Sequence, residues 1–363
     1  MERLVQWRMH KNLCGCTHAE IAALFAGLDP PVPPLRAVQV YRWIRGGAAS
    51  FDVMSNLDSA VRRQLAGQFS LRTWTLAAAV RAGDGTENLR LQTGGGDCIE
   101  AVILHDGGGR HTACLSTQLG CAMGCVFCKT GQLGLARNLD AAEIIEQYYL
   151  INERLAAHGQ NEVANIVFMG MGEPFQNMAA LRQVCAILSG ADCAGTGRAR
   201  SGRTCFSKKR ITVSTCGLAG KICDFAREGP DIRLAVSLHS ARQELRRRLM
   251  PAASPLAELK DALLFYQQMC ARRITLEVVL FDGVNMGRED AAALAVFAGG
   301  LDVFVNLIPW NPVEGLVLDG KALASPSRPA VLSFQRLLEA RGLTTAVRAK
   351  KGGSVSGACG QLG

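Results

Sequence analysis

Apolar residues recur at helical spacing through the first 75 residues, and the spacing then becomes that of short strands. Amphipathic stretches predict helices at 18–26, 35–44 and 58–65, with a proline-rich break at 29–34. β-like runs at 74–81, 88–92 and 98–104 follow, separated by glycine-rich turns. This change of texture predicts a domain boundary within 90–110.

Beyond residue 110, short apolar strands alternate with amphipathic helices. The strands are expected at 112–116, 165–169, 210–214, 232–237, 274–281, 303–308 and 344–348. The helices are expected at 141–157, 178–188, 218–228, 256–270, 288–298 and 329–340. Such alternation predicts an α/β fold with a parallel sheet covered by helices, and about six strand–helix units fit. An incomplete barrel and an open doubly wound sheet both satisfy the pattern.

Four segments therefore make up the predicted organisation. A helical N-terminal domain spans 1–75, and a short β extension or linker spans 76–110. The α/β domain spans 111–348, and a C-terminal loop spans 349–363, where glycines on both sides of Cys359 predict mobility.

The charge balance favours a polyanionic partner, because 40 Lys and Arg stand against 31 Asp and Glu and give a formal charge of +9. A solvated basic surface is an equally good explanation of this excess. The sequence has no uncharged apolar run long enough for a membrane span and opens without a signal pattern. We therefore expect a soluble cytoplasmic protein without membrane contact.

Three of the 14 cysteines are packed into one short loop. Cys121, Cys125 and Cys128 have the spacing C-x3-C-x2-C and follow a predicted strand. Three thiolates at this spacing can converge on a soft metal. They would suit an iron–sulfur cluster with one open iron. They would also suit a zinc ion completed by Cys114 or His111, or simply a buried core.

Polar and glycine residues fall just beyond several predicted strands. They are Gly172 and Glu173, Ser214, the stretch from Ser237 through Leu238 to His239, and Asn311. Ligands of α/β proteins bind at the carboxyl ends of parallel strands, so these positions are candidates for one binding site.

Six motifs in order carry a family resemblance. They are CLSTQLGC at 114–121, FCKTG at 127–131, RNL at 137–139, GMGEP at 170–174, IPWNP at 308–312 and ACGQL at 358–362. From about residue 35 to the end, the chain resembles the RlmN/Cfr family of radical S-adenosylmethionine (SAM) RNA adenine methyltransferases. The resemblance implies an incomplete (β/α)6 TIM-like barrel with a small helical N-terminal domain that recognises RNA.

The resemblance also implies roles for individual residues. Cys121, Cys125 and Cys128 are expected to bind a 4Fe–4S cluster. Cys359 is expected to accept a methyl group from SAM, and Cys114 to release the product by forming a transient disulfide with Cys359. Glu100 matches a proton acceptor. The expected SAM contacts are Gly172, Glu173, Ser214, Ser237, Leu238, His239 and Asn311.

The implied reaction is methylation of adenine carbon 2 in 23S rRNA, with tRNA as a further substrate, through an S-methylcysteine intermediate. The alternatives are methylation of carbon 8 of the same ribosomal adenine and, from another class, a non-catalytic zinc-binding RNA module. A monomer with an electron donor such as flavodoxin is expected. Candidate phosphate contacts are Arg198, Arg200, Arg203, Lys208, Lys209 and Arg210.

Overall fold

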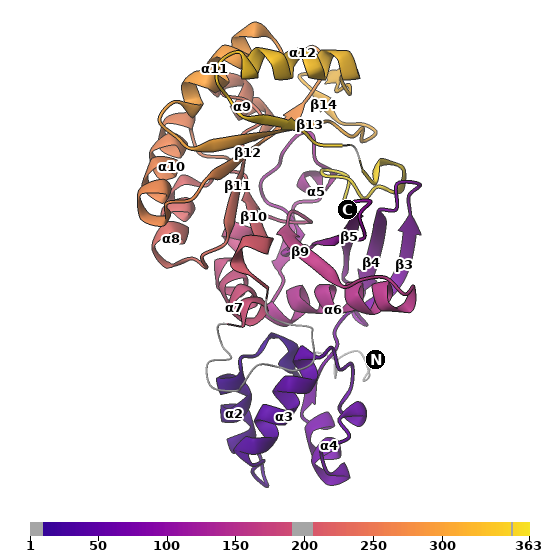
Figure 1. Ribbon diagram of the computed structural model, residues 1–363. Coiled ribbons are helices and arrows are strands. Elements are labelled where there is room, and N and C mark those ends of the chain that lie inside the picture. Colours follow the sequence, from indigo (N-terminus) through magenta and orange to yellow (C-terminus); the bar gives the residue numbers. More distant parts are fainter. Residues whose placement is uncertain (1–9, 191–205, 350) are drawn as a thin grey trace.

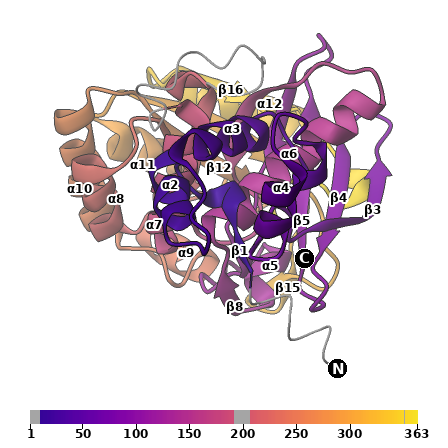
Figure 2. The same ribbon diagram turned by 90° about the horizontal axis from the view of Figure 1, so that it is seen from below.

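A small helical unit at the N-terminus stands beside a large curved sheet (Figure 1). The computed structural model describes residues 10–190, 206–349 and 351–363. The helices of the small unit are α2 (His18–Ala26), α3 (Pro34–Arg45) and α4 (Ser59–Ala66). Thr17 and Glu20 form a reciprocal capping box at the start of α2. Figure 2 shows these helices gathered over one end of the larger domain.

Short elements and buried polar contacts attach this unit to the rest of the molecule. The short elements are β1 (Lys11–Asn12), η1 (Leu13–Gly15), η2 (Phe51–Val53) and β2 (Phe69–Ser70), and β1 pairs with β2 in parallel. The long helix α6 (Ala141–Ala157) carries Glu146, whose carboxylate accepts hydrogen bonds from the amides of Thr73 (2.7 Å) and Trp74 (3.0 Å). Arg45 on α3 donates to the Tyr149 hydroxyl on α6 (3.1 Å). These bonds satisfy polar groups that the contact buries.

The central sheet has ten strands in the order β16-β13-β12-β11-β10-β9-β6-β5-β4-β3. The antiparallel part is β3 (Thr75–Arg81), β4 (Glu87–Gln92) and β5 (Cys98–His105), which pairs with the next strand, β6. The parallel part is β6 (His111–Cys114), β9 (Val163–Phe168), β10 (Ile211–Thr215), β11 (Arg233–Ser237), β12 (Ile274–Leu280), β13 (Val303–Pro309) and β16 (Thr345–Val347).

Helices follow the parallel strands and cover the outer face of the sheet (Figure 1). After α6 they are α7 (Met178–Ser189), α8 (Ala219–Glu228), α9 (Gln243–Leu249), α10 (Leu256–Cys270), α11 (Arg288–Ala298) and α12 (Arg328–Glu339). The parallel strands keep their chain order across the sheet. A doubly wound sheet reverses its strand order at a switch point. The predicted α/β fold is therefore confirmed. Of the two architectures that the sequence pattern allowed, the structure is the incomplete barrel and not the doubly wound sheet.

Several short elements have no counterpart in the predicted pattern. They are the hairpin of β7 (Gln118–Gly120) and β8 (Leu135–Asn138), α5 (Lys129–Gln132), α9, the hairpin of β14 (Val317–Leu318) and β15 (Lys321–Ala322), and the turns η3 (Pro174–Gln176), η5 (Lys208–Arg210) and η6 (Gly353–Val355). They are too short to show a clear periodicity. Within the described residues, no helix has both the length and the apolar character that crossing a bilayer requires.

Candidate active site

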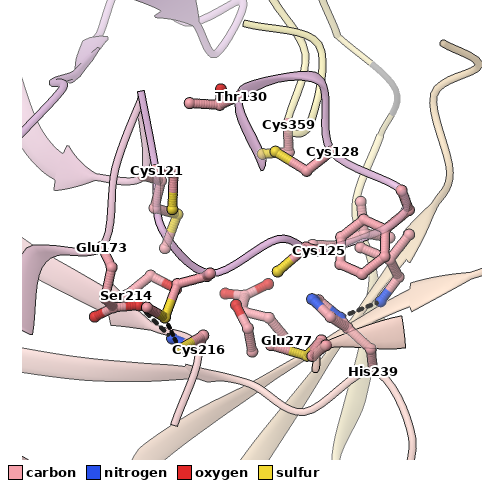
Figure 3. Close-up of a pocket in the computed structure, with 18 of the residues that line it drawn as sticks. Cys121, Cys125, Cys128, Thr130, Glu173, Ser214, Cys216, His239, Glu277 and Cys359 are labelled. Carbon is pink, nitrogen blue, oxygen red and sulfur yellow. Dashed lines mark hydrogen bonds between the residues drawn. The ribbon is translucent and has the colours of Figure 1, made fainter. Parts of the chain in front are cut away.

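A cavity of about 160 Å³ lies at the carboxyl ends of the parallel strands. Side chains at the ends of β9 to β13 form one wall of the cavity. The cysteine loop after β7 forms a second wall, and the C-terminal segment forms a third. Figure 3 shows residues from these three parts of the chain facing a common space. The cavity is therefore assembled from segments that are far apart in sequence.

The three clustered cysteines line this cavity. Pairing of β7 with β8 closes the base of their loop, and the Cys121 amide donates to the Gly134 carbonyl at 2.8 Å. The Cys128 amide donates to the Cys125 carbonyl at 3.1 Å, which turns the loop back on itself. In Figure 3 the three sulfur atoms surround the cavity and do not point apart.

Burial works against a charged form of these thiols. It raises the pKa of Cys121 to about 11, and it raises the pKa values of Cys125 and Cys128 as well. The mutual repulsion of the thiolates adds to this for Cys121 and Cys125. Cysteine ligands bind metals as thiolates, so a cationic metal core has to offset the cost of ionising them here.

The donor set suits a cluster better than a single ion. Within the part of the chain that the structure describes, no three His, Cys, Asp or Glu side chains gather closely enough to hold one metal ion. Each cysteine of a cubane binds a different iron atom, so its sulfurs stand further apart than those around one zinc ion. His111 lies at the opposite end of β6 and packs its ring against His105. The three thiols thus fit a 4Fe–4S cluster.

Glu173 follows β9 and is buried against the cavity. Its carboxylate accepts hydrogen bonds from the amides of Phe175 (2.9 Å) and Cys216 (2.7 Å), and its own amide donates to the Gln118 side chain (2.7 Å). Burial raises the pKa of this carboxyl, while the amide bonds oppose that shift. The side chains of Thr215 and Cys216 also interact with this carboxylate, so a ligand donor that reaches Glu173 would join or replace these contacts.

His239 has a defined protonation state. It is fully desolvated by burial, which lowers its pKa to about 3. The ring is therefore neutral, and Nδ1 accepts from the Val279 amide at 3.1 Å. This bond leaves Nε2 with the proton, as a donor. The edge of the ring packs against Phe127 of the cysteine loop.

The other predicted SAM contacts divide into two groups. Gly172, Ser214, Ser237 and Asn311 line the cavity together with Glu173 and His239. Leu238 does not line it, and its side chain is fully buried in the hydrophobic core. A residue at the end of a strand therefore lines the cavity only if its side chain points into the cavity and not into the hydrophobic core.

The C-terminal segment brings Cys359 to the cysteine loop. The Lys129 amide donates to the Gly360 carbonyl at 2.8 Å, and the Thr130 hydroxyl donates to the Leu362 carbonyl at 2.5 Å. Cys359 lines the main cavity and a smaller adjoining one that Cys114 also lines. Its ionised form would raise the pKa of Cys114, which burial already raises to about 12. Both thiols are free.

Glu100 lies outside the main cavity. It is half-buried on β5 and lines a separate cavity of about 220 Å³ with Arg90 and Gly363. Its carboxylate accepts from the Gly363 amide at 3.2 Å. The structure thus does not bring Glu100 into the cavity that holds Cys359.

Two charged residues in the cavity wall were missed from the sequence. Glu277 is buried in β12, where Asn306 donates to its carboxylate at 2.7 Å, and burial raises its pKa. Arg348 follows β16, and its guanidinium donates to the Cys359 sulfur at 3.6 Å. An ionised Cys359 and the carboxylate of Glu277 would raise the pKa of Arg348, as would an ionised Cys114, whereas burial opposes that rise. An acidic residue within an otherwise apolar strand was the available signal for Glu277.

The predicted phosphate contacts lie away from the cavity or outside the described residues. Lys208, Lys209 and Arg210 are exposed on η5, which precedes β10. They therefore stand at the amino end of that strand, at the opposite edge of the sheet from the cavity. Arg198, Arg200 and Arg203 lie outside the described residues.

Comparison with known proteins gives consistent matches along the chain. The Radical SAM superfamily pattern matches residues 115–295, and that of the ribosomal RNA large subunit methyltransferase N-terminal domain matches residues 11–71. A probable dual-specificity RNA methyltransferase RlmN of Treponema pallidum (strain Nichols) is 41% identical over 90% of this chain and 91% of its own length. A protein of the same description from Moorella thermoacetica is 43% identical over 91% of each chain. The crystal structure of a radical SAM methyltransferase from Sphaerobacter thermophilus superimposes with a TM-score of 0.87 at 38% identity, covering 97% of this chain and 99% of that one.

Proposed function

Because the chain belongs to the RlmN family of radical SAM RNA methyltransferases, we propose that it methylates carbon 2 of adenine in 23S rRNA and in tRNA. The observation that carries the proposal is the position of Cys359, which lines the same cavity as Cys121, Cys125 and Cys128. A zinc-binding module would need its ligands gathered tightly around one ion, and the described residues hold no group of three His, Cys, Asp or Glu side chains close enough for that.

In this proposal Cys121, Cys125 and Cys128 hold the 4Fe–4S cluster, and the strand-end residues hold SAM. When bound, these cofactors supply a methyl group and a 5′-deoxyadenosyl radical, chemistry that belongs to them and not to the protein. Glu173 accepts a charge-assisted hydrogen bond from the methionine ammonium. The neutral ring of His239 offers an Nε2–H donor, and Asn311 offers an amide at the boundary of the two cavities.

Cys359 is the methyl acceptor. An adenine ring carbon is not a nucleophile, whereas a thiolate is, so the methyl group goes first to sulfur. The guanidinium of Arg348 donates to the Cys359 sulfur and so holds that sulfur at the cavity. Loss of a hydrogen atom from that S-methyl group to the 5′-deoxyadenosyl radical would leave a carbon radical that can add to the adenine ring. The base has to be unstacked and extruded to reach so buried a site.

Cys114 and Glu100 complete the proposed reaction. Cys114, which lines the same small cavity as Cys359, attacks the Cys359 sulfur, so that the sulfur–carbon bond to the product breaks and a disulfide forms, which a cellular reductant reopens. Glu100 accepts the ring proton, which requires the C-terminal residue now bonded to its carboxylate to move. A one-electron donor such as flavodoxin reduces the cluster, and the N-terminal unit recognises the RNA, with the chain acting as a monomer.

Methylation of RNA from a strain lacking the gene tests the proposal. Anaerobically reconstituted protein, SAM and a reductant are incubated with 23S rRNA or tRNA, and the nucleosides are identified by mass spectrometry against 2-methyl and 8-methyl adenosine standards. We expect 2-methyladenosine from the wild type, none from Cys359→Ala, and an undiminished yield from Cys223→Ala, a half-buried cysteine on α8. The 8-methyl product would refute the regiochemistry, and unmodified RNA from an iron-loaded wild type would refute the function.

A further inference from the structure

Arg246 on α9 is a buried cation without a carboxylate partner in the part of the chain that the structure describes. Its side chain is 1% exposed. Nη1 donates to the Ser254 carbonyl at 2.6 Å, and Nη2 donates to the Cys216 carbonyl at 2.8 Å. Nε has no hydrogen-bond partner among the described residues. Arginine stays protonated in proteins, so this site carries a full positive charge in a poorly solvated place.

The neighbouring arginines of the same helix differ in this respect. Arg247 is exposed and pairs with Glu244, and Arg248 is exposed and pairs with Asp319. Water and an opposite charge compensate both of them. Only at Arg246, of these three, does the protein bury the charge without such compensation.

The helix holds this charge close to the cysteine loop. The Leu249 carbonyl at the end of α9 accepts from the Val126 amide at 3.1 Å, so the helix is bonded to the loop between Cys125 and Cys128. Cys216, whose carbonyl Arg246 binds, lines the cavity with Cys125.

A buried uncompensated charge is costly, so an opposite charge is expected nearby when the protein is in its working state. A cubane with three thiolate ligands is anionic. It becomes more negative by one charge when it takes one electron from an external reductant, and no bond is made or broken in that step. Reduction potentials of iron–sulfur clusters depend on the charges around them.

We propose that Arg246 is the counter-charge of the cluster, and that it raises the cluster's reduction potential by stabilising the reduced form. The inference rests on the proposed function, because that function places the cluster on Cys121, Cys125 and Cys128. Arg246 does not touch the reacting atoms and acts as a positioning and tuning residue. A change at Arg246 is therefore expected to alter the reduction potential of the cluster directly, and the rate of methylation only as a consequence.

The test is an anaerobic redox titration of the reconstituted protein, monitored by electron paramagnetic resonance and optical absorbance. Iron and sulfide are counted for each protein first. Arg246→Gln keeps donors for the two carbonyls but removes the charge, and Arg246→Lys keeps the charge. Arg247→Gln removes an exposed charge from the same helix and is the matched control.

We expect Arg246→Gln to make reduction at least tenfold less favourable, a negative shift of at least about 59 mV for a one-electron couple. Arg246→Lys should recover most of that shift, and Arg247→Gln should leave the potential at the wild-type value. Ser254→Asp, which adds a negative charge at the residue whose backbone carbonyl Arg246 binds, provides a second route and should also shift the potential negatively. The potential of Ser254→Asp serves as the test of the proposal if Arg246→Gln does not bind iron.

The possible failures are distinguishable. A wild-type protein that binds no iron contradicts the proposed function itself. An iron-loaded Arg246→Gln with the wild-type potential overturns the inference, and so does an equal shift in Arg247→Gln. If only Ser254→Asp can be loaded, an unchanged potential in that variant overturns it as well.

Discussion

Replacing Gly172 by alanine tests how the strand-end loop builds the cofactor site. The backbone at Gly172 has φ +100°, and a Cβ atom there would lie 2.5 Å from Cβ, 2.7 Å from Cγ and 2.9 Å from the backbone nitrogen of Gln118. Real Cβ atoms do not approach backbone so closely, so the loop or Gln118 has to move. Gln118 cannot move freely, because its side chain accepts from the Glu173 amide and donates to Asn138 at 2.7 Å in each case.

The cost follows from two separate effects. A side chain in this region of φ costs roughly 1–3 kcal/mol. The overlap with Gln118 adds about 1–3 kcal/mol, as overpacking does elsewhere. The expected loss of unfolding free energy is therefore about 2–6 kcal/mol, a large part of the stability of an ordinary domain. Gly134→Ala is the matched control, since Gly134 has φ +69° but no atom within 4 Å of the added carbon.

Urea denaturation under anaerobic conditions, followed by tryptophan fluorescence, measures both variants. Gly134→Ala should lose only about 1–2 kcal/mol from backbone strain. Gly172→Ala should lose clearly more and should also bind SAM more weakly, because the moved loop carries Glu173. Equal losses in the two variants, with unchanged SAM binding, would refute the steric reasoning.

Two further predictions concern buried polar groups. Burial raises the pKa of Glu146 to about 7 from an ordinary value of 4.5. Between these values the folded state binds more protons than the unfolded state, so stability should fall as pH rises from 5 to 8, by roughly 3 kcal/mol in total. Urea midpoints across that range should show the fall, and Glu146→Gln should flatten it; an equally steep fall in that variant would contradict the assignment. Asn285 is buried and donates to the carbonyls of His239 (2.8 Å) and Val279 (2.7 Å). Asn285→Ala should cost about 1–3 kcal/mol and weaken SAM binding by releasing His239, whose φ is +54°. Calorimetric titration with SAM checks this against Asn161→Ala, an exposed amide with a single bond to the Gly109 carbonyl.

Local pattern was sufficient for the main elements of the fold. The predicted helices at 18–26, 141–157, 256–270 and 288–298 have the observed bounds, and the first two each begin at a side-chain capping box. The helix α9 escaped prediction, since seven residues rich in arginine show no long apolar stripe. Yet α9 carries Arg246, one of the most deeply buried charges in the described chain.

By itself, the sequence determined most of the long strands and helices, and it determined that three thiols lie in one short loop. Both are properties of neighbouring residues, so spacing reveals them. Only the tertiary structure decided that Glu277 and Arg348 enter the cavity, that Leu238 and Glu100 lie outside it, and that Cys359 reaches the cysteine loop. The environment of a side chain depends on segments hundreds of residues away, and the energetic consequence of burying a charge exists only once those segments have packed together.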